Sequence, residues 1–268
     1  MDCMKSMIAS RTTNPVRGKV YLVGAGPGAP DLLTLRAAAI LRRADIVFHD
    51  ALVHQETLLL AQNAEKIAVG KRCGKLSTAQ RFINKRLVDA ARKHAVVVRL
   101  KGGDPMLFGR AQEEIEALQA AGINFEVVPG VTAALAASAG LGISLTQRGV
   151  SRNVAFVTAR VGEGQTDHDW AASAVAADTA LIYMGVGQAR LIADTLMARG
   201  RSPATPVVVV ENASLPGERR FALSLSDLPH VAGLGIKGPA LIMLGEVFAA
   251  VQQTAGFADA LPETAAVS

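Results

Sequence analysis

The sequence predicts an α/β protein with two domains, and two observations lead to that prediction. Short runs rich in β-branched residues alternate with segments that carry apolar residues every three or four positions, as expected where strands alternate with helices. In the first half the strands end at glycine-rich loops, which indicates a Rossmann-like sheet, whereas the second half has fewer helices, which favours an α+β domain. We expect an N-terminal α/β domain over 18–135, a C-terminal α+β domain over 136–249, and loose tails at 1–17 and 250–268.

The elements of the first half have clear local signals. Ser77 is suited to cap a helix, and Ala79, Ile83, Leu87 and Ala90 after it share one helical face. The expected order is strand 20–23, helix 34–43, strands 46–48 and 66–69, a helix that starts after Ser77, strand 96–100, a helix with Phe108, Ala111, Ile115 and Leu118 on one face, and strand 125–128. Loops that follow these strands meet at the carboxyl edge of one sheet, where open α/β sheets bind ligands.

The second half carries strands more clearly than helices. Residues 187–199 give the best helical pattern, with Ala189, Ile192 and Leu196 in phase. Strands are expected at 154–158, 181–184, 207–210, 221–225 and 241–244.

Composition narrows the class of partner. A net charge of +5 favours a polyanionic partner, but aromatic residues make up only 4% of the chain, which disfavours stacking on nucleic acid. We therefore expect a small molecule with several carboxylates. Two cysteines, no secretory signal over 1–17 and no run of about 18 apolar residues predict a soluble cytoplasmic protein without membrane contact. The five histidines are scattered, so we expect no metal site.

Two glycine loops are candidates for ligand binding. Gly24 to Ala29 fits the loose G-x-G-x-x-G/A pattern, and Asp50 ends the next strand, so a nicotinamide oxidoreductase is one alternative. Against it, Pro27 removes an N–H that a pyrophosphate would need, and Pro30 delays the helix. A tight turn without any ligand is a second alternative. In the other loop, 101–105, paired glycines allow close approach of a ligand and Asp104 could hold a ribose or an amino group.

Further motifs join these loops in a fixed order over about residues 19–248. They are VGAGPGAPDLLT (23–34), HDALV (49–53), VGKRCGK (69–75), RLKGGDPMLFGR (99–110), VPGVTAA (128–134), GISLTQR (142–148), YMG (183–185) and PALIMLGEV (239–247). With these motifs the chain resembles the uroporphyrinogen-III C-methyltransferase family of tetrapyrrole (precorrin) methylases. RLKGGDP-x-x-FGR is the most specific of them.

The resemblance implies a two-domain class III (tetrapyrrole) methyltransferase fold and a homodimer. It implies two sequential C-methylations of uroporphyrinogen III to precorrin-2, with S-adenosyl-L-methionine as methyl donor and S-adenosyl-L-homocysteine as product. Precorrin-2 leads to sirohaem or cobalamin. Another precorrin methylase, or a tetrapyrrole-binding protein without catalysis, remains an alternative.

The resemblance also implies site residues. A cofactor trough between the domains would be formed by Pro27, Gly102, Gly103, Asp104, Leu107, Thr132, Ala133, Met184 and Ala213. Asp50 and Lys71 would be proton acceptor and donor.

The acidic arms of the substrate need cationic partners. Arginine suits bidentate carboxylate contacts, so Arg72, Arg148 and Arg152, which follow strands, are candidate substrate ligands. We place Arg110 nearest the chemistry, oriented by Glu113 three residues later. The chain departs from the family pattern at Ala29, Ser144, Gln147 and Ala159-Arg160, which bears on substrate geometry and on the second methylation.

Overall fold

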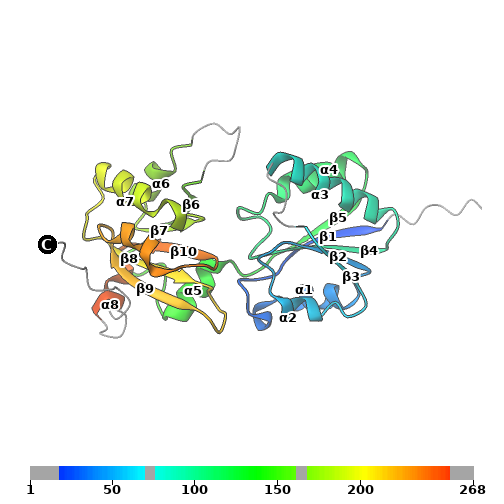
Figure 1. The fold of residues 1–268 in the computed structure, drawn as a ribbon, viewed down its shortest axis with the longest axis horizontal. Coiled ribbons are helices and arrows are strands. Elements are labelled where there is room, and N and C mark those ends of the chain that lie inside the picture. Colours follow the sequence, from blue (N-terminus) through cyan, green and yellow to red (C-terminus); the bar gives the residue numbers. More distant parts are fainter. Residues whose placement is uncertain (1–17, 70–75, 161–167, 254–268) are drawn as a thin grey trace, which may run out of the picture.

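The computed structural model describes residues 18–69, 76–160 and 168–253, and these form two lobes (Figure 1). The first lobe holds a five-stranded, all-parallel sheet in the order β3-β2-β4-β1-β5. Its strands are β1 (Lys19–Gly24), β2 (Ile46–His49), β3 (Glu65–Ala68), β4 (Val96–Lys101) and β5 (Asn124–Val128). The predicted Rossmann-like sheet is confirmed.

Helices cover both faces of this sheet. In Figure 1, α1 (Leu35–Arg42) and α2 (Gln55–Leu59) lie below it, and α3 (Leu76–Ala91) and α4 (Ala111–Ala120) lie above it. Central parallel strands are buried on both faces and so consist of continuous apolar runs, as in the VVV of β4. The 3-10 turn η1 (Pro30–Leu32) precedes α1, and Thr34 Oγ1 caps α1 by accepting the Ala37 N–H at 3.1 Å.

The second lobe is built on a mixed sheet, which confirms the expected α+β character. Its order is β6-β7-β10-β8-β9, in which only β6 and β7 pair in parallel. The strands are β6 (Val154–Thr158), β7 (Thr179–Tyr183), β8 (Pro206–Glu211), β9 (Arg219–Ser224) and β10 (Ala240–Leu244). The helices are α5 (Ala133–Leu141), α6 (Trp170–Ala176), α7 (Ala189–Ala198) and α8 (Ala249–Gln253), with 3-10 segments η2 (Val186–Gln188), η3 (Leu228–Leu234) and η4 (Glu246–Phe248).

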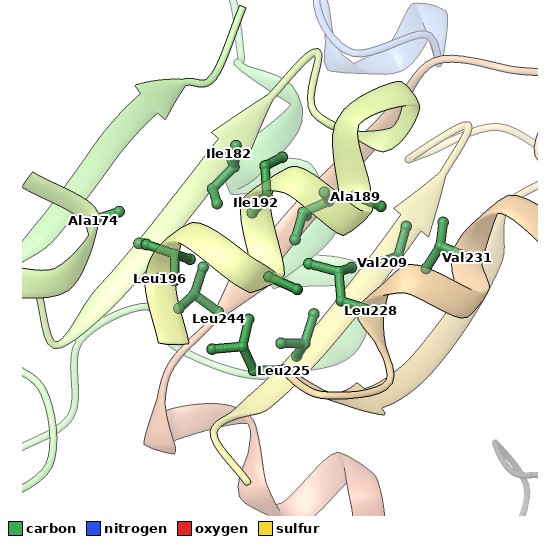
Figure 2. Close-up of a cluster of buried hydrophobic side chains, with 14 of the residues drawn as sticks. Ala174, Ile182, Ala189, Ile192, Leu196, Val209, Leu225, Leu228, Val231 and Leu244 are labelled. Carbon is green, nitrogen blue, oxygen red and sulfur yellow. The ribbon is translucent and has the colours of Figure 1, made fainter. Parts of the chain in front are cut away.

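A separate core supports each face of the second sheet. On one face, Ile192 and Leu196 of α7 pack with Leu228 and Val231 of η3 against the sheet (Figure 2). On the other face, Ala134 and Ala137 of α5 and Phe248 of η4 pack against Val208, Val210 and Met243. Strands β7 and β8 pack in these cores, and the loops that follow them carry Met184 and Ala213.

The structure differs from the sequence predictions at several elements. Helices α2, α5 and α6 were not predicted, and α4 begins at Ala111 rather than near Phe108. Helix α3 begins at Leu76, one residue before the expected cap Ser77. Helix α5 spans the expected domain limit at 135/136, and α8 occupies the first residues of the expected tail, with Val251 buried.

The functional edges of the two sheets face each other. Strands β1 to β5 all run the same way, and β6, β7 and β8 are mutually parallel through their pairings. Ala29, after β1, donates its N–H to Ser214 Oγ, after β8, at 3.1 Å. Thr132, after β5, lies 2.6 Å from the Tyr183 hydroxyl at the end of β7. The carboxyl ends of β1 and β5 therefore meet those of β7 and β8 at one interlobe junction. No helix in the described parts of the chain has the length and apolar character needed to cross a membrane.

Candidate active site

Three glycines hold the loops of the first lobe in close contact at the junction. A Cβ on Gly130 would lie 2.3 Å from the Gly103 carbonyl oxygen, and one on Gly24 would lie 2.6 Å from the Gly130 Cα. Gly26 and Gly103 exchange backbone hydrogen bonds of 3.2 and 2.7 Å. The approaches at Gly24 and Gly130 involve backbone atoms only, so no larger residue fits at either position without moving the loops.

The first glycine loop has few donors left for a ligand. The N–H groups of Ala25, Gly26 and Ala29 already donate to Lys101 O, Gly103 O and Ser214 Oγ. Pro27 and Pro30 have no N–H at all. A pyrophosphate requires several backbone donors, so this geometry disfavours the nicotinamide alternative.

Asp104 organises the second glycine loop. Its Oδ1 accepts the Met106 N–H at 2.8 Å, and its Oδ2 accepts the Gly130 N–H at 2.9 Å. Asp104 thereby ties the loop after β4 to the end of β5. The sequence had suggested a direct contact with a ribose or amino group, and the structure adds this role within the loop.

An open space lies beside Gly103. Gly103 has φ +67°, and a Cβ built on it would find only the Thr132 Cα, at 4.0 Å. Next to Gly103 begins α5, whose N-cap Thr132 makes no side-chain cap bond because its Oγ1 contacts the Tyr183 hydroxyl. Ala133 is the first residue of the helix. The backbone of Gly103 is therefore uncrowded on this side, and a small ligand can approach it closely beside the start of α5.

Tyr183 joins the two lobes and was missed in the sequence, where only the adjacent Met184 was assigned. Its hydroxyl contacts Thr132 Oγ1 and accepts the Ala134 N–H at 3.3 Å. Burial raises the pKa of the Tyr183 phenol, and the bonds from Thr132 and Ala134 oppose that rise. The Tyr183 ring lies 5.2 Å from the ring of Phe108, centroid to centroid.

Strained backbone collects at the same junction. In the described chain the non-glycine residues with positive φ are Phe108, Arg110, Met184, Asn212 and Ser214. All of them follow the carboxyl ends of β4, β7 or β8. Such conformations cost about 1–3 kcal/mol each and gather at functional sites. The buried Ala213, assigned to the cofactor, lies between two of these residues.

Apolar side chains are exposed around the junction. They come from the loops after β2 and β4, from α5, from β6 and from the end of β7. They are Leu52, Met106, Phe108, Leu135, Phe156 and Met184, six of the eleven large hydrophobic side chains exposed in the described residues. A gathering of this kind is typical of a ligand site rather than of ordinary surface.

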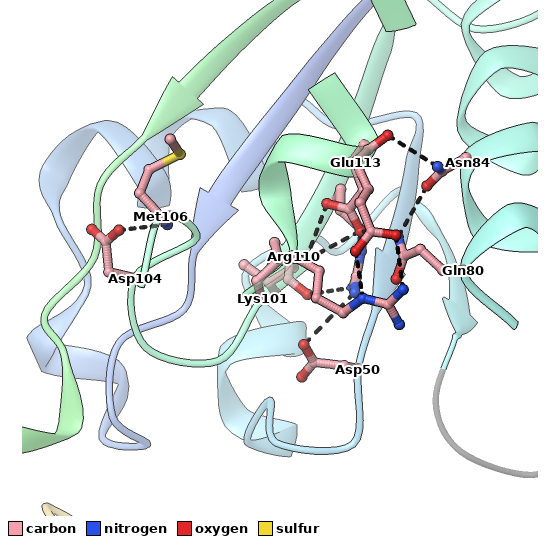
Figure 3. Close-up of polar contacts among 11 residues, drawn as sticks. Asp50, Gln80, Asn84, Lys101, Asp104, Met106, Arg110 and Glu113 are labelled. Carbon is pink, nitrogen blue, oxygen red and sulfur yellow. Dashed lines mark hydrogen bonds and ion pairs between the residues drawn. The ribbon is translucent and has the colours of Figure 1, made fainter. Parts of the chain in front are cut away.

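Arg110 and Glu113 form the ion pair that the sequence predicted. Arg110 Nε lies 2.7 Å from Glu113 Oε1, and one terminal nitrogen lies 2.8 Å from Oε2, a bidentate contact (Figure 3). The position of Arg110 relative to the helix differs from the expectation. Arg110 is the N-cap of α4 with φ 55°, not a residue within the helix. The pair fixes the direction of a half-exposed guanidinium at the end of β4.

Beneath Asp50 lies a charged cluster that the sequence analysis missed. Arg99 and Lys101 of β4 both contact the Glu114 carboxylate of α4, with the nearest nitrogen–oxygen distances at 3.0 Å. Arg99 also lies 3.8 Å from Asp50 Oδ2. A signal was present: in VVVRLK, Arg99 and Lys101 share one face of a strand that is otherwise apolar.

The structure describes two of the three candidate substrate arginines. Arg148 and Arg152 are exposed, in and beside the turn closed by the Gln147–Ser151 bridge. Lys71 and Arg72 lie outside the described residues. A groove of about 360 Å³ is lined by Leu135 and Ser138 of α5, Ser144, Leu145 and Thr146 of the following loop, and Val154 and Phe156 of β6.

Glu211 supports the loop that carries Ala213. Its buried carboxylate accepts the N–H groups of Lys237 and Gly238 at 2.7 and 2.6 Å, and Arg219 Nε donates to it at 2.6 Å. Burial would raise the pKa of Glu211, but the donors from Gly238, Lys237 and Arg219 together hold that pKa below its ordinary value of 4.5. The charged form is therefore favoured in the folded protein.

We predict that Glu211→Gln lowers the free energy of unfolding at pH 7 by about 2–3 kcal/mol, since a charged acceptor of three hydrogen bonds is lost. Because the folded-state pKa is depressed, the contribution is present above about pH 4.5 and is lost as the pH falls through the folded value. Urea unfolding at pH 7 and pH 4 should show the gap between parent and variant narrowing in acid. The exposed Glu56→Gln serves as control, and an unchanged gap would contradict the assignment.

Comparison with known proteins gives a consistent result. The sequence model of the tetrapyrrole (corrin/porphyrin) methylases matches residues 19–229. Siroheme synthases of Psychrobacter sp. (strain PRwf-1) and Chromobacterium violaceum are 45% and 46% identical over 233 and 232 residues, in each case 86% of this chain. The matches cover 48% and 49% of those proteins, so the chain spans about half the length of the curated relatives it matches.

Solved structures share the fold. A uroporphyrin-III C-methyl transferase from Thermus thermophilus, complexed with S-adenyl homocysteine, has a TM-score of 0.75 and 43% identity, and the match covers 87% of this chain and 100% of that one. A cobalt precorrin-4 methyltransferase has the same TM-score of 0.75 at 28% identity, covering 86% and 95% of the two chains. Because the two TM-scores are equal, the fold alone does not indicate which of these proteins the chain resembles more. The sequence identity is higher to the uroporphyrin-III C-methyl transferase.

Proposed function

Since the chain belongs to the tetrapyrrole (corrin/porphyrin) methylases and has their class III fold, we propose that it transfers two methyl groups in sequence from S-adenosylmethionine to uroporphyrinogen III, giving precorrin-2. The observation that carries the proposal is the uncrowded backbone of Gly103 beside the start of α5 at Thr132, in a chain that is 43% identical to a transferase complexed with S-adenyl homocysteine. A nicotinamide oxidoreductase is not supported, because the matched family is one of methylases and the first glycine loop has few free donors.

The residues at the junction fit the methyl donor. Gly103 leaves room for a group against its backbone, and the exposed Met184 follows β7 in the second lobe. We assign to the donor Pro27, Gly102, Gly103, Asp104, Leu107, Thr132, Ala133, Met184 and Ala213. Bound S-adenosylmethionine supplies a methyl group that its sulfonium has already activated, and it leaves as S-adenosylhomocysteine.

The chain's task is then to position an electron-rich pyrrole carbon in line with that methyl group. Positioning of this kind supplies about 7–11 kcal/mol of barrier reduction. Arg110, oriented by Glu113, binds a carboxylate arm of the substrate, and Arg148 and Arg152 bind others near the groove beside α5. The same role is proposed for Arg72. The apolar rim at Phe108 excludes water from the reacting atoms.

The macrocycle loses a proton once the new carbon–carbon bond has formed. Asp50 is partly exposed, with 25% of its side chain accessible, and it lies beside Gly102 of the second glycine loop. Its Oδ1 accepts the Leu52 N–H at 3.1 Å, and we assign the proton to Oδ2, which lies 3.8 Å from Arg99. We assign the complementary donor role to Lys71.

The proposal extends to the assembly and the pathway. The relatives matched over half their length are siroheme synthases, so we propose that this chain performs the methylation part of that conversion, in the cytoplasm. We also propose a homodimer. Light scattering should then give twice the 27.9 kDa of one chain, and a value of one chain would contradict the dimer.

Mass spectrometry of an anaerobic reaction tests the function. The protein is incubated with uroporphyrinogen III and methyl-labelled S-adenosylmethionine, and we expect a product with two added methyl groups. A later precorrin is offered in parallel, because a fold shared with a cobalt precorrin-4 methyltransferase makes it the relevant competing substrate. Methylation of the later precorrin alone, or of neither compound, would overturn the proposal.

We predict that Asp104→Ala weakens S-adenosylhomocysteine binding by about tenfold or more, since two hydrogen bonds to a carboxylate hold the loop in place. Isothermal titration calorimetry measures the Kd. The exposed Asp194 of α7 gives the control Asp194→Ala, which should bind normally. An unchanged Kd in Asp104→Ala would remove Asp104 from the site.

A further inference from the structure

Three ionisable side chains meet in the interior of the first lobe. Arg99 and Lys101 of β4 are 4% and 3% exposed, and Glu114 of α4 is fully buried. Lys101 Nζ contacts both Glu114 oxygens at 3.1 and 3.0 Å, Arg99 Nε contacts Oε1 at 3.0 Å, and Gln80 of α3 donates to Oε1 at 3.3 Å. Figure 3 shows Gln80 of α3 and Lys101 of β4 among these polar contacts, near Arg110 and Asp50.

Burying three charged side chains in a protein core costs free energy. Moving each charge out of water costs several kcal/mol, and apolar residues of similar volume would serve the core as well or better. Burial lowers the pKa of Lys101, the charge of Arg99 lowers it further, and Glu114 opposes both. The formal charges of Arg99, Lys101 and Glu114 sum to +1, so one positive charge is not balanced inside the cluster.

The carboxylate of Asp50, to which we assign the proton lost by the substrate, lies close to this cluster. Arg99 lies 3.8 Å from Asp50 Oδ2. Within the described residues, Lys101 also interacts with the charge of Asp50, and the Leu52 N–H donates to Asp50 Oδ1, while the His49 ring contacts only the Asp50 backbone carbonyl. The excess charge of the cluster is thus directed at Asp50.

We propose that Glu114 is a positioning residue that acts through Arg99 and Lys101 and sets how readily Asp50 takes up a proton. With Glu114 in place the formal charges of the cluster sum to +1, and Arg99 brings positive charge to 3.8 Å from Asp50 Oδ2. The inference rests on the proposed function, in which Asp50 accepts the proton from the substrate. Glu114 itself touches no substrate.

Variants that raise or lower the formal charge of the cluster test the inference, because they should shift the pH at which Asp50 takes up a proton in opposite directions. Glu114→Gln removes the one negative charge of the cluster and, at a pH where Lys101 keeps its proton, raises the formal charge to +2, so Asp50 should take up its proton at a lower pH than in the parent. Lys101→Met lowers the charge to 0, so Asp50 should take it up at a higher pH. We expect shifts of about one pH unit. The double variant Lys101→Met/Glu114→Gln restores +1 and should return the midpoint toward the parent value.

Carbon-13 NMR of protein labelled at aspartate carboxyls measures the midpoint, with Asp50 assigned by its absence in Asp50→Asn. Gln80→Met removes a hydrogen bond without changing charge and should leave the midpoint in place. Thermal unfolding verifies that each variant is folded. If Glu114→Gln does not fold, Lys101→Met and the double variant decide alone. Midpoints that stay fixed, or that move in the same direction in both single variants, overturn the inference.

The NMR readout needs no substrate, so the inference and the proposed function can fail separately. In the parent and in each variant, the acid limb of the pH–rate profile should follow the Asp50 midpoint. Opposite shifts by NMR in a protein that does not methylate uroporphyrinogen III would support the cluster's effect and refute the function. A methylating protein whose acid limb ignores both charge changes would refute the inference alone.

Discussion

Replacing Arg110 with alanine is expected to lower kcat/KM for uroporphyrinogen III by about 100- to 1000-fold, which corresponds to about 3–4 kcal/mol of lost transition-state binding. The guanidinium is already oriented by its bidentate contact with Glu113, so it can meet a carboxylate arm without further ordering. The donor contacts assigned at Gly103 and Thr132 do not involve Arg110. Affinity for S-adenosylhomocysteine should therefore stay within about twofold of the parent, which is under 0.5 kcal/mol.

Arg92 provides the matched control. It is also an exposed arginine, but it follows α3 at the edge of the sheet where β4 begins, away from the junction. Arg92→Ala should leave turnover unchanged. Steady-state kinetics of both variants, with calorimetry of cofactor binding, separates the two roles. Normal turnover in Arg110→Ala would remove this residue from the mechanism, and a lost cofactor affinity would reassign it to the donor site.

Gly130→Ala is expected to disrupt the cofactor site through the backbone. The added methyl would lie 2.3 Å from the Gly103 oxygen and 2.9 Å from the Gly24 Cα, and neither atom belongs to a flexible side chain. Overpacking of this kind costs about 1–3 kcal/mol, or roughly 3–10 °C in Tm for a chain of this size. Because Gly103 must move, affinity for S-adenosylhomocysteine should fall by more than tenfold, which is about 1.4 kcal/mol or more.

Gly233→Ala is the control, since a Cβ on Gly233 meets no atom within 4 Å. It should leave both Tm and affinity close to the parent values. Differential scanning calorimetry and titration calorimetry report the two quantities. If Gly130→Ala binds S-adenosylhomocysteine with parental affinity, the donor does not rest on the three-glycine contact.

The fold of the first lobe was predictable because its signals are local. Strands such as VYLV and VVV are uniformly apolar, glycines mark their ends, and α3 has a clear amphipathic period. Helix α5 escaped prediction because AALAASAGL packs small residues on several sides and has no polar face. Helix α2 has only five residues, too few for a periodic signal. Strand order and the mixed pairing of the second sheet depend on contacts distant in sequence.

The candidate site was predictable in part. Pairing of Arg110 with Glu113 followed from their spacing, and its confirmation shows that sequence proximity suffices where both partners lie in one motif. The left-handed N-cap at Arg110 and the Tyr183–Thr132 contact depend on tertiary structure, with 51 residues separating the latter pair. Glu114 lies among the apolar positions of α4, and only its burial between two basic side chains of β4 reveals its role.

A crystal structure of the protein with S-adenosylhomocysteine tests the central claim most directly. The ligand should lie against Gly103 and beside the start of α5 at Thr132, with Met184 and Ala213 from the second lobe in contact. The claim would be contradicted by a ligand bound elsewhere, for instance in the groove beside Phe156 of β6, with no contact to Gly103 or Thr132.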